Sequence, residues 1–311
     1  MAAWTASDIP DQSGRTAVVT GANSGLGYVT ARELARRGAR VILACRSEER
    51  GSAAVARMLT EVPGAHVEFG RLDLGDLASV RAFAAAYEET RLDLLINNAG
   101  VMALPFRRTV DGFETQFGVN HLGHFALTGL LLPRLLERPG SRIVTVSSGL
   151  HALGNIDIHD LNSERSYRRW LAYGRSKTAN LLFTHELARR LVASGSDTVA
   201  AAAHPGYAST NLQSAGPRME GRRAAERVAA LGNRIFAQSA EAGAVPILYA
   251  ATAPGVRPDW FTGPRGLGFR GGAGPSWRAA WTRSDVGGER LWAASEGLTG
   301  VRFLPLSGGA P

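Results

Sequence analysis

The stretch TGANSGLG, residues 20–27, decides how this sequence folds. It contains three glycines and no charge, and it follows the apolar run TAVVT at 16–20. The residues after it, GYVTARELARRG at 27–38, have the composition of a helix that Gly38 closes. The glycines therefore lie in a turn between a first strand and a first helix, where backbone amides and the positive helix end can hold a pyrophosphate.

The spacing of these glycines leaves two interpretations open. Gly21, Gly25 and Gly27 follow the pattern G-x-x-x-G-x-G, not the commoner dinucleotide fingerprint G-x-G-x-x-G. The turn either binds a dinucleotide or is a strand-to-helix connection that happens to be rich in glycine. The rest of the sequence has to separate these alternatives.

The same alternation of strand and helix continues along the 311 residues. Short apolar runs separated by Ala- and Leu-rich stretches predict further strands at RVILAC (40–45), HVEFGRLDL (66–74), LDLLINNAG (92–100), SRIVTVSS (141–148) and DTVAAAAHPG (197–206). Ser47 is the expected cap of the second helix. Nearly continuous apolar strands between helices predict an α/β fold with a parallel sheet covered on both faces. The Gly-, Pro- and Arg-rich stretch 254–275 is predicted to be a loop region.

Composition excludes several classes of protein. The single cysteine, Cys45, excludes an intrachain disulfide and a cysteine-built zinc site, which favours a reducing, cytoplasmic location. No run of about 18 apolar residues predicts a membrane span, and residues 1–14 lack the pattern of a signal peptide. The net charge of +8 comes from scattered arginines without a basic block, so a basic surface is favoured over a nucleic-acid site.

Three further motifs follow the glycine turn in a fixed order. They are NNAG at 97–100, YGRSK at 173–177 and HPG at 204–206. Together with TGANSGLG they resemble the short-chain dehydrogenase/reductase family over about residues 14–303. The resemblance implies one doubly wound Rossmann-type domain with a seven-stranded parallel sheet, preceded by an extension at 1–13 and followed by a tail at 304–311.

Longer stretches narrow the resemblance. HALGNIDIHDLNSE (151–164), YRRWLAYGRSKTANLLFTHELARRL (167–191) and ERLWAASEGLTGV (289–301) resemble the retinol dehydrogenase branch and its soluble bacterial relatives. That branch places a long segment between its catalytic serine and tyrosine, as this sequence does between Ser148 and Tyr173. Membrane-bound members carry an amino-terminal anchor, which we do not expect in this chain.

The expected acid–base chemistry depends on Tyr173 and Lys177. A phenol with a pKa near 10 is a poor acid–base group at neutral pH unless a positive charge favours its phenolate. These residues lie four apart on one face of a predicted helix, so the ammonium can supply that charge. The resemblance implies that Tyr173 is the acid/base and that Lys177 tunes it and binds the cofactor ribose.

The resemblance supplies two further catalytic assignments. Either serine of VTVSS could end its strand, and the family pattern selects Ser148 to bond the substrate oxygen, which leaves Ser147 structural. Asn120, in GVNHLGHF, matches the family asparagine that holds a water between the lysine and solvent. His121 and His124 lack a third ligand at sensible spacing, so packing is favoured over a metal site, and His185 is taken as an ordinary helix residue.

The end of the second strand predicts which nicotinamide cofactor binds. Cys45 occupies the place of the carboxylate that binds the ribose hydroxyls of NAD, and Arg46 follows it. A guanidinium there can pair with a 2′-phosphate, so the sequence favours NADP(H), with Asn23 and Ser24 as further phosphate contacts. The full expected cofactor site, carried by the resemblance, is Gly21, Asn23, Ser24, Gly25, Leu26, Gly27, Arg46, Asp73, Leu74, Asn98, Ala99, Gly100, Tyr173, Lys177, Pro205, Gly206 and Thr210.

The substrate is predicted only as a class. Residues 211–236 occupy the position of the family's substrate lid and contain an apolar set among arginines: Met219, Val228, Leu231, Ile235 and Phe236. Such a helix would suit a small hydrophobic aldehyde, ketone or alcohol, but it could instead pack on the core, a membrane surface or a second subunit of a homo-oligomer. The favoured function is an NADP(H)-dependent oxidoreductase that interconverts carbonyl and alcohol. The alternative is a non-catalytic NADP(H)-binding sensor or scaffold, which an incomplete Ser–Tyr–Lys set would have favoured.

Overall fold

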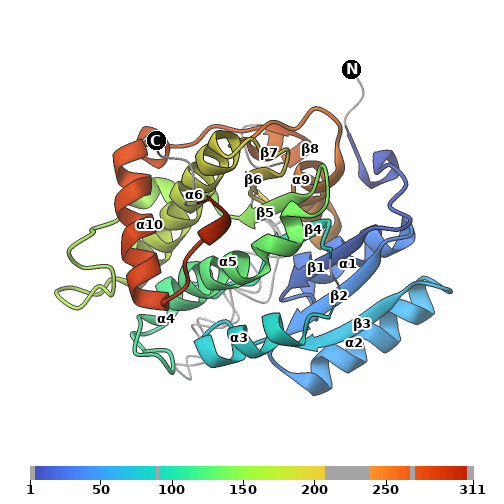
Figure 1. Cartoon of the computed structure of the whole chain (residues 1–311), viewed down its shortest axis with the longest axis horizontal. Coiled ribbons are helices and arrows are strands. Elements are labelled where there is room, and N and C mark those ends of the chain that lie inside the picture. The colour runs from blue at the N-terminus through green and yellow to red at the C-terminus, as the bar shows by residue number, and fades with distance from the viewer. Residues whose placement is uncertain (1–3, 89–90, 207–238, 267–269, 307–311) are drawn as a thin grey trace.

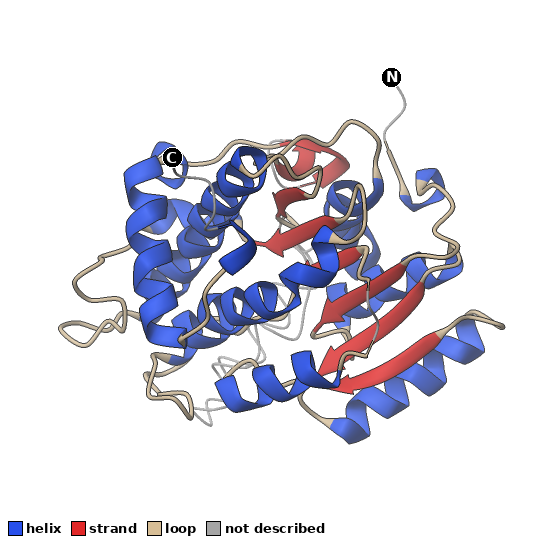
Figure 2. Cartoon of the chain, in the orientation of Figure 1, coloured by secondary structure: helices blue, strands red, loops and turns tan. Residues whose placement is uncertain are grey.

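An eight-stranded sheet runs through the middle of the molecule, with helices against both of its faces (Figures 1 and 2). The computed structural model describes residues 4–88, 91–206, 239–266 and 270–306. The strands lie in the order β3-β2-β1-β4-β5-β6-β7-β8, and only the β7–β8 pair is antiparallel. Their bounds are β1 Thr16–Thr20, β2 Arg40–Cys45, β3 Val67–Arg71, β4 Leu94–Asn97, β5 Arg142–Val146, β6 Val199–Ala203, β7 Phe261–Gly266 and β8 Arg270–Pro275.

The helices between these strands form two layers (Figure 1). Their bounds are α1 Gly25–Arg36, α2 Glu48–Glu61, α3 Leu77–Ala86, α4 Thr115–Phe117, α5 Gly123–Leu136, α6 Arg169–Ala193, α9 Ala240–Thr252 and α10 Asp285–Thr299. A π-helical segment, Gly118–Leu122, joins α4 to α5. Short 3₁₀ segments cover Ala6–Asp8, Gly149–Leu153, Ala280–Arg283 and Leu304–Leu306.

Alternation along the strands divides the core between the two layers. In β1, Ala17 and Val19 pack in the cluster that contains α1, α2 and α9, whereas Val18 packs in the cluster that contains α3, α5, α6 and α10. Successive strand side chains point to opposite faces, so a central strand that is covered on both sides has to be apolar at every position. This requirement explains the continuous apolar runs of the sequence and confirms the doubly wound α/β class.

The strand count is the main correction to the predicted fold. The sheet has eight strands instead of seven, because residues 270–275 add an antiparallel strand at one edge. Both β7 and β8 lie in the stretch 254–275, which the sequence predicted to be a loop. Its glycines and Pro264 give no alternating pattern, and the pairing register shifts between Pro264 and Gly266. An irregularity of this kind accommodates a proline that cannot donate to the ladder.

Helix boundaries follow local chemistry where the sequence predicted them. The Arg50 amide donates to Ser47 Oγ at 3.4 Å, which confirms Ser47 as the cap of α2. Gly38 follows α1 with φ of 92°, a left-handed conformation that ends the helix at little cost for glycine.

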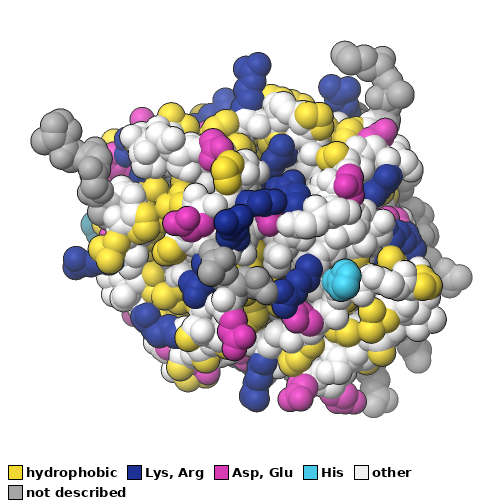
Figure 3. All heavy atoms as spheres, turned by 45° about the vertical axis from the view of Figure 1, so that its right-hand side comes forward, with side chains coloured by type: hydrophobic (Ala, Val, Ile, Leu, Met, Phe, Trp, Pro, Cys, Tyr) yellow, Lys and Arg dark blue, Asp and Glu magenta, His cyan; other side chains and the backbone are white. Residues whose placement is uncertain are grey.

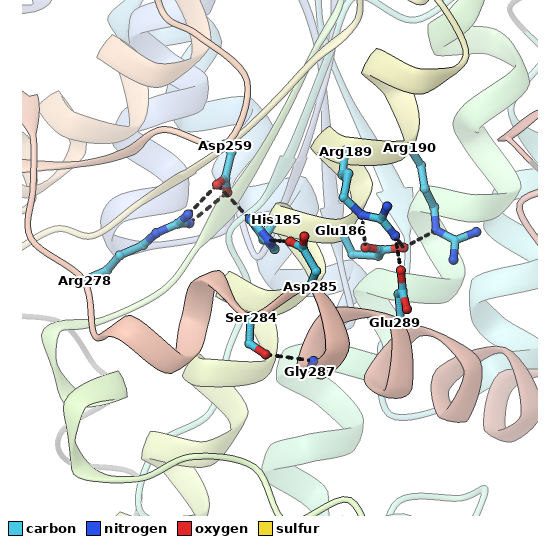
Figure 4. A network of polar contacts seen from close by, with 10 residues as sticks. All are labelled: His185, Glu186, Arg189, Arg190, Asp259, Arg278, Ser284, Asp285, Gly287 and Glu289. Carbon is cyan, nitrogen blue, oxygen red and sulfur yellow. Dashed lines mark hydrogen bonds and ion pairs between the residues drawn. The ribbon is translucent and has the colours of Figure 1, made fainter. Parts of the chain in front are cut away.

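Charged side chains join α6 to α10 and to the segment before β7 (Figure 4). His185 Nδ1 lies 2.8 Å from Asp259 Oδ2, and its Nε2 lies 2.7 Å from Asp285 Oδ1. Arg278 pairs with Asp259 from the other side. The buried Glu186 carboxylate accepts hydrogen bonds from Arg189 and Arg190. His185 lies within α6, as the sequence predicted, and it is also part of a junction between three elements, which the sequence did not indicate.

Candidate active site

The strand order of the sheet brings most of the predicted site residues to one edge, where the parallel strands end. The glycine turn follows β1, Arg46 follows β2, the NNAG loop begins in β4 and Ser148 follows β5. Carboxyl ends of parallel strands meet at the same edge, and the strand order reverses between β1 and β4. That reversal is where open α/β sheets bind their ligands.

The glycine turn is shaped by contacts that only glycine permits. A Cβ on Gly27 would lie 2.5 Å from Asn98 Nδ2 and 2.6 Å from the Gly21 carbonyl oxygen. Gly21 and Gly25 have φ of 66° and 56°, and the space where a Gly25 Cβ would lie is open. Ser24 begins α1 without a side-chain capping hydrogen bond. The turn thus presents the start of a 12-residue helix to an open space, which suits a phosphate group.

A buried hydrogen-bond network fixes the NNAG loop against this turn. The amides of Asn98 and Ala99 each donate to Thr20 Oγ1 at 2.9 Å. His124 Nδ1 lies 3.0 Å from the Asn120 carbonyl, so the ring carries its proton there and its Nε2 accepts from the Thr20 hydroxyl at 2.9 Å. Burial lowers the pKa of His124 to about 4, which keeps the ring neutral. His124 is thus a structural support for the loop.

The two serines after β5 have different surroundings. Ser147 is buried, and its hydroxyl donates to the Lys177 carbonyl at 2.9 Å. Ser148 Oγ accepts from the Leu150 amide at 3.2 Å and hydrogen-bonds with the Tyr173 side chain. The residue facing the tyrosine is therefore Ser148, and Ser147 supports the backbone of α6.

Tyr173 and Lys177 lie together inside the protein, on one face of α6. Tyr173 is 5% exposed and Lys177 3% exposed, and Lys177 Nζ lies 5.7 Å from the centroid of the Tyr173 ring. Burial raises the pKa of Tyr173 to about 12, while its hydrogen bond with Ser148 opposes the rise. Burial also lowers the pKa of Lys177 to about 8. At neutral pH this arrangement holds a protonated phenol beside an ammonium group.

Lys177 and Asn120 both lie close to Gly100, in the loop after β4, where an added Cβ would be 3.5 Å from Lys177 Nζ and 3.2 Å from Asn120 Oδ1. Lys177 Nζ donates to the Val146 carbonyl at 3.1 Å. Asn120 Nδ2 donates to the Val101 carbonyl and to Ser176 Oγ, both at 2.9 Å, and its Oδ1 accepts from the Val101 amide at 2.8 Å. Asn120 lies in the π-helical segment, a form that is frequent at functional sites. It fixes the loop beside α6.

The residues expected around the adenosine lie at the ends of β2 and β3. Arg46 Nε is 3.9 Å from Asp73 Oδ2, with side chains 70% and 37% exposed respectively. The Gly75 amide donates to Asp73 Oδ1 at 2.9 Å. Leu74 is buried, and Cys45 is also buried with a thiol pKa raised to about 11, so Cys45 is not a reactive thiol.

The HPG turn lies after β6. The Gly206 amide donates to His204 Nδ1 at 3.2 Å, and His204 Nε2 then donates to Ser276 Oγ at 2.8 Å. Burial lowers the pKa of His204 to about 4. Thr210 and the predicted lid at 211–236 lie outside the described residues.

The sequence did not predict the apolar wall beside Tyr173, which consists of Met102, Ala103 and Leu150. Met102 and Ala103 pack against the Tyr173 ring, and the partly buried Leu150 adds to this cluster. Ala103 has φ of 51°, which is unusual for a residue with a Cβ. The only sequence signal for this wall is the apolar character of the residues that follow NNAG, and these residues show no helical or strand periodicity.

Metal-ligating side chains do not assemble here. Over the described ranges, no group of three or more His, Cys, Asp and Glu side chains could hold a metal ion. His121 is buried between Phe117 and Phe125, and its Nε2 bonds Ser295 Oγ at 2.9 Å. No helix of the described part of the chain is long and apolar enough to span a membrane.

Comparison with known proteins identifies the family. Residues 15–221 match the model of the short chain dehydrogenase family. The chain is 42% identical over 294 residues to retinol dehydrogenase 12 of Homo sapiens, covering 93% of this chain and 88% of that protein. It is also 53% identical over 201 residues to retinol dehydrogenase 11 of Homo sapiens, covering 64% of this chain and 63% of that protein.

A solved structure supports the same conclusion. An uncharacterized protein from Mycobacterium Paratuberculosis has a TM-score of 0.81 and 48% identity, with coverage of 97% of this chain and 99% of that chain. The family match, the relatives and the fold agree with the four motifs on which the predicted resemblance rested. The chain therefore belongs to the short-chain dehydrogenase/reductase family of oxidoreductases, in its retinol dehydrogenase-like branch.

Proposed function

We propose that this protein is an NADP(H)-dependent oxidoreductase that reduces a carbonyl group of a small hydrophobic substrate, with Tyr173 as the proton donor. The observation that carries the proposal is the place of Lys177. It is the only lysine among the 35 lysine and arginine residues, and it lies inside the protein 5.7 Å from the Tyr173 ring centroid. Everywhere else this sequence uses arginine for positive charge.

An amine differs from a guanidinium in a way that matters here. Arginine stays charged and brings a broad planar group, whereas lysine is compact and shifts its pKa readily when buried. The lowered pKa of Lys177, about 8, still leaves it mostly charged at neutral pH. A buried ammonium beside the phenol favours the phenolate that remains after Tyr173 has given up its proton.

The protonation state of Tyr173 supports the direction of reduction. A raised pKa keeps its hydroxyl protonated at neutral pH, which is the state needed to protonate a carbonyl oxygen as it becomes an alcohol. Ser148 would bond the same oxygen, a role that its side-chain hydrogen bond with Tyr173 supports. When bound, the reduced nicotinamide supplies the hydride.

The residues of the site fit a phosphorylated dinucleotide. The open space at the start of α1 suits the pyrophosphate, and an added Cβ on Gly100 would come within 3.5 Å of Lys177 Nζ, which places that loop beside the proposed ribose ligand. Arg46 is the candidate 2′-phosphate ligand because its guanidinium is exposed at the sheet edge and no acid occupies position 45. A related structure, described as an NAD(P)-dependent gluconate 5-dehydrogenase from Beutenbergia cavernae, holds NADP at low occupancy; it has a TM-score of 0.58 and 27% identity and covers 78% of this chain.

The substrate class follows from the wall beside Tyr173 and from the relatives. Met102, Ala103 and Leu150 present apolar surface next to the phenol, which suits the hydrocarbon part of an aldehyde or ketone. Retinol dehydrogenases 11 and 12 are among the relatives, so retinal belongs in the first set of test compounds. The cytoplasmic location and a homo-oligomeric state stay predictions.

An NADPH-depletion screen tests the proposal. Purified protein is incubated with NADPH and with retinal, medium-chain aldehydes and aromatic ketones, and absorbance of the reduced nicotinamide is followed. We expect depletion with at least one apolar carbonyl compound and none with Tyr173→Phe. Tight NADPH binding without turnover of any compound would favour the sensor or scaffold alternative.

The face drawn in Figure 3 gives no support to the nucleic-acid alternative. On the face drawn in Figure 3, basic side chains lie among acidic and apolar ones and do not form one continuous field. The basic residues of this face therefore do not make the continuous basic surface that a nucleic-acid site needs.

A further inference from the structure

A buried polar cluster next to the proposed site has no role in the chemistry described above. It consists of Glu114, Gln116 and Tyr167, and it contacts the loop that carries Met102 and Ala103. Gln116 is completely buried and Glu114 is 1% exposed. Buried polar groups are costly unless they are hydrogen-bonded, so their partners indicate what the cluster does.

Gln116 uses every hydrogen-bonding group of its side-chain amide. Its Oε1 accepts from the Ala103 amide at 2.7 Å. Its Nε2 donates to the Tyr167 hydroxyl at 2.8 Å and to the Arg169 carbonyl at 3.0 Å. An amide N–H can only donate and a carbonyl can only accept, so this set of partners fixes the orientation of the Gln116 amide.

Tyr167 and Glu114 complete the cluster. The Tyr167 hydroxyl donates to the Leu104 carbonyl at 2.7 Å, which holds the residue that follows Ala103. The Glu114 carboxylate accepts from the amides of Gln116 and Phe117 at 2.9 and 2.8 Å and so caps α4. Burial raises the pKa of Glu114. The cluster therefore holds two consecutive backbone groups of one loop.

The held loop is strained and faces the reacting group. Ala103 adopts φ of 51°, a conformation that costs an alanine roughly 1 kcal/mol and persists only where surrounding contacts impose it. Met102 and Ala103 are 9% and 8% exposed and pack on the Tyr173 ring. The Gln116 side chain thus holds the backbone of a residue that packs beside the phenol.

We propose that Gln116 is a positioning residue that holds Ala103 in its left-handed conformation and thereby fixes the apolar wall that selects the size of the carbonyl substrate. The part of this inference that concerns substrate size rests on the proposed function, whereas the hold of Gln116 on Ala103 does not. The side-chain hydrogen bonds of Gln116 go to Ala103, Tyr167 and Arg169. It acts through the loop, and Tyr167 assists it at Leu104.

The test uses Gln116→Met, which keeps a similar length and volume but removes the amide. The matched control is Gln12→Met, because Gln12 is 1% exposed and its side-chain amide also bonds backbone carbonyls, those of Pro10 and Asp11. Gln12 precedes β1 and so lies at the opposite edge of the sheet from the site. Steady-state kinetics with NADPH compare a straight-chain medium-length aldehyde with an aryl ketone.

We expect Gln116→Met to change the ratio of kcat/KM for the two compounds about fivefold or more, mainly through KM, while Gln12→Met leaves the ratio unchanged. A merely structural role would lower the active fraction for both compounds equally and leave the ratio alone. Ratios that shift no more in Gln116→Met than in Gln12→Met would overturn the proposal. If Gln116→Met does not fold, Tyr167→Phe removes one hydroxyl from the same cluster and is judged by the same ratio.

Amide hydrogen exchange separates this inference from the proposed function, since it needs neither cofactor nor turnover. In Gln116→Met the Ala103 amide should exchange about three- to tenfold faster, the loss expected for one intramolecular hydrogen bond. Gln12→Met should leave that amide unchanged. Unaltered exchange at Ala103 would overturn the inference even if the enzyme is active. Faster exchange in a protein that reduces no carbonyl compound would instead count against the proposed function alone.

Discussion

Arg46 Nε lies 3.9 Å from Asp73 Oδ2, so the end of β2 and the end of β3 are linked by a weak, exposed ion pair. Such a pair contributes little to stability, because both side chains remain in contact with water. It does hold the guanidinium near the place expected for the adenosine end of the dinucleotide. We therefore expect Arg46 to affect which cofactor binds.

Arg46→Ala should erase most of the preference for NADPH over NADH. A charge-assisted contact with the 2′-phosphate is worth about 1.5–3 kcal/mol, so NADPH affinity should fall about ten- to a hundredfold while NADH affinity stays nearly constant. Arg36→Ala removes the same charge from the far end of α1 and should leave both affinities unchanged. Fluorescence titration of both cofactors measures the effect. Equal binding of NADH and NADPH by the wild type would contradict this assignment.

Gly25→Ala should weaken NADPH binding beyond its effect on folding. An alanine at φ of 56° costs about 1 kcal/mol, and its Cβ would enter the open space at the start of α1. Gly64→Ala is the matched control: Gly64 has φ of 81°, and an added Cβ there would also meet no atom within 4 Å. Gly64 precedes β3 and so lies at the opposite ends of the strands from the site.

Both variants should lose similar thermal stability, and only Gly25→Ala should bind NADPH at least about tenfold more weakly, equivalent to about 1.4 kcal/mol. Calorimetry of binding and thermal unfolding of both proteins provide the comparison. Equal NADPH affinity in Gly25→Ala and Gly64→Ala would place the pyrophosphate elsewhere.

Lys177 should titrate near pH 8 in the protein without cofactor. Burial disfavours its ammonium form and lowers its pKa to about 8 from the usual lysine value of 10.5. Because Lys177 is the only lysine, protein labelled with ¹³Cε-lysine gives one resonance whose shift reports this group alone. NADPH should raise the measured pKa, since its negative charge favours the ammonium. A titration midpoint near the usual lysine value of 10.5 would show that Lys177 is not buried as described.

His185 should make stability depend on pH in a defined direction. The hydrogen bond with Asp259 has the largest effect on the pKa of His185 and raises it above 6.5. The hydrogen bond with Asp285 raises this pKa further, whereas burial lowers it. A raised folded-state pKa means that the stabilisation is complete below the unfolded value near 6.5 and is lost as pH rises through the folded value. The junction of Figure 4 should therefore be strongest under mildly acidic conditions.

Thermal unfolding of His185→Gln tests this sign. The variant should lose roughly 1 kcal/mol relative to wild type near pH 6, and the difference should shrink toward pH 9. Exposed His66 offers the control His66→Gln, which should stay close to wild type throughout. A deficit in His185→Gln that is constant from pH 6 to pH 9 would show that the ring is not charged in the junction.

The sequence predicted the parts of the fold that depend on local pattern. The apolar runs up to 206 became β1 to β6, and the glycine turn, Ser47 and Gly38 took the expected places. The strand and turn predictions were correct because each structure restricts the residue type directly. A strand buried on both faces requires apolar residues, and a turn with positive φ favours glycine. The prediction of a loop at 254–275 was wrong, because β7 and β8 form by backbone pairing along a glycine-rich segment. Such a segment has no alternating pattern of side chains that would predict strands.

Contacts between distant residues set the other limit. His185 meets Asp259 and Asp285 at separations of 74 and 100 residues, and Gln116 meets Tyr167 at 51. No spacing rule connects such pairs. The motif residues Ser148, Tyr173 and Lys177 were identifiable because a family pattern, not a periodicity, links them.

Steady-state kinetics of Tyr173→Phe, with NADPH titrated in parallel, test the central claim most directly. The variant deletes one hydroxyl and keeps the ring that packs on Met102 and Ala103, so the fold and the NADPH affinity should survive. Loss of the proton donor should lower kcat by about 10²–10⁴-fold, whereas Lys177→Ala should lower NADPH affinity as well. A folded Tyr173→Phe protein that binds NADPH and reduces the substrate at close to the wild-type rate would contradict the account.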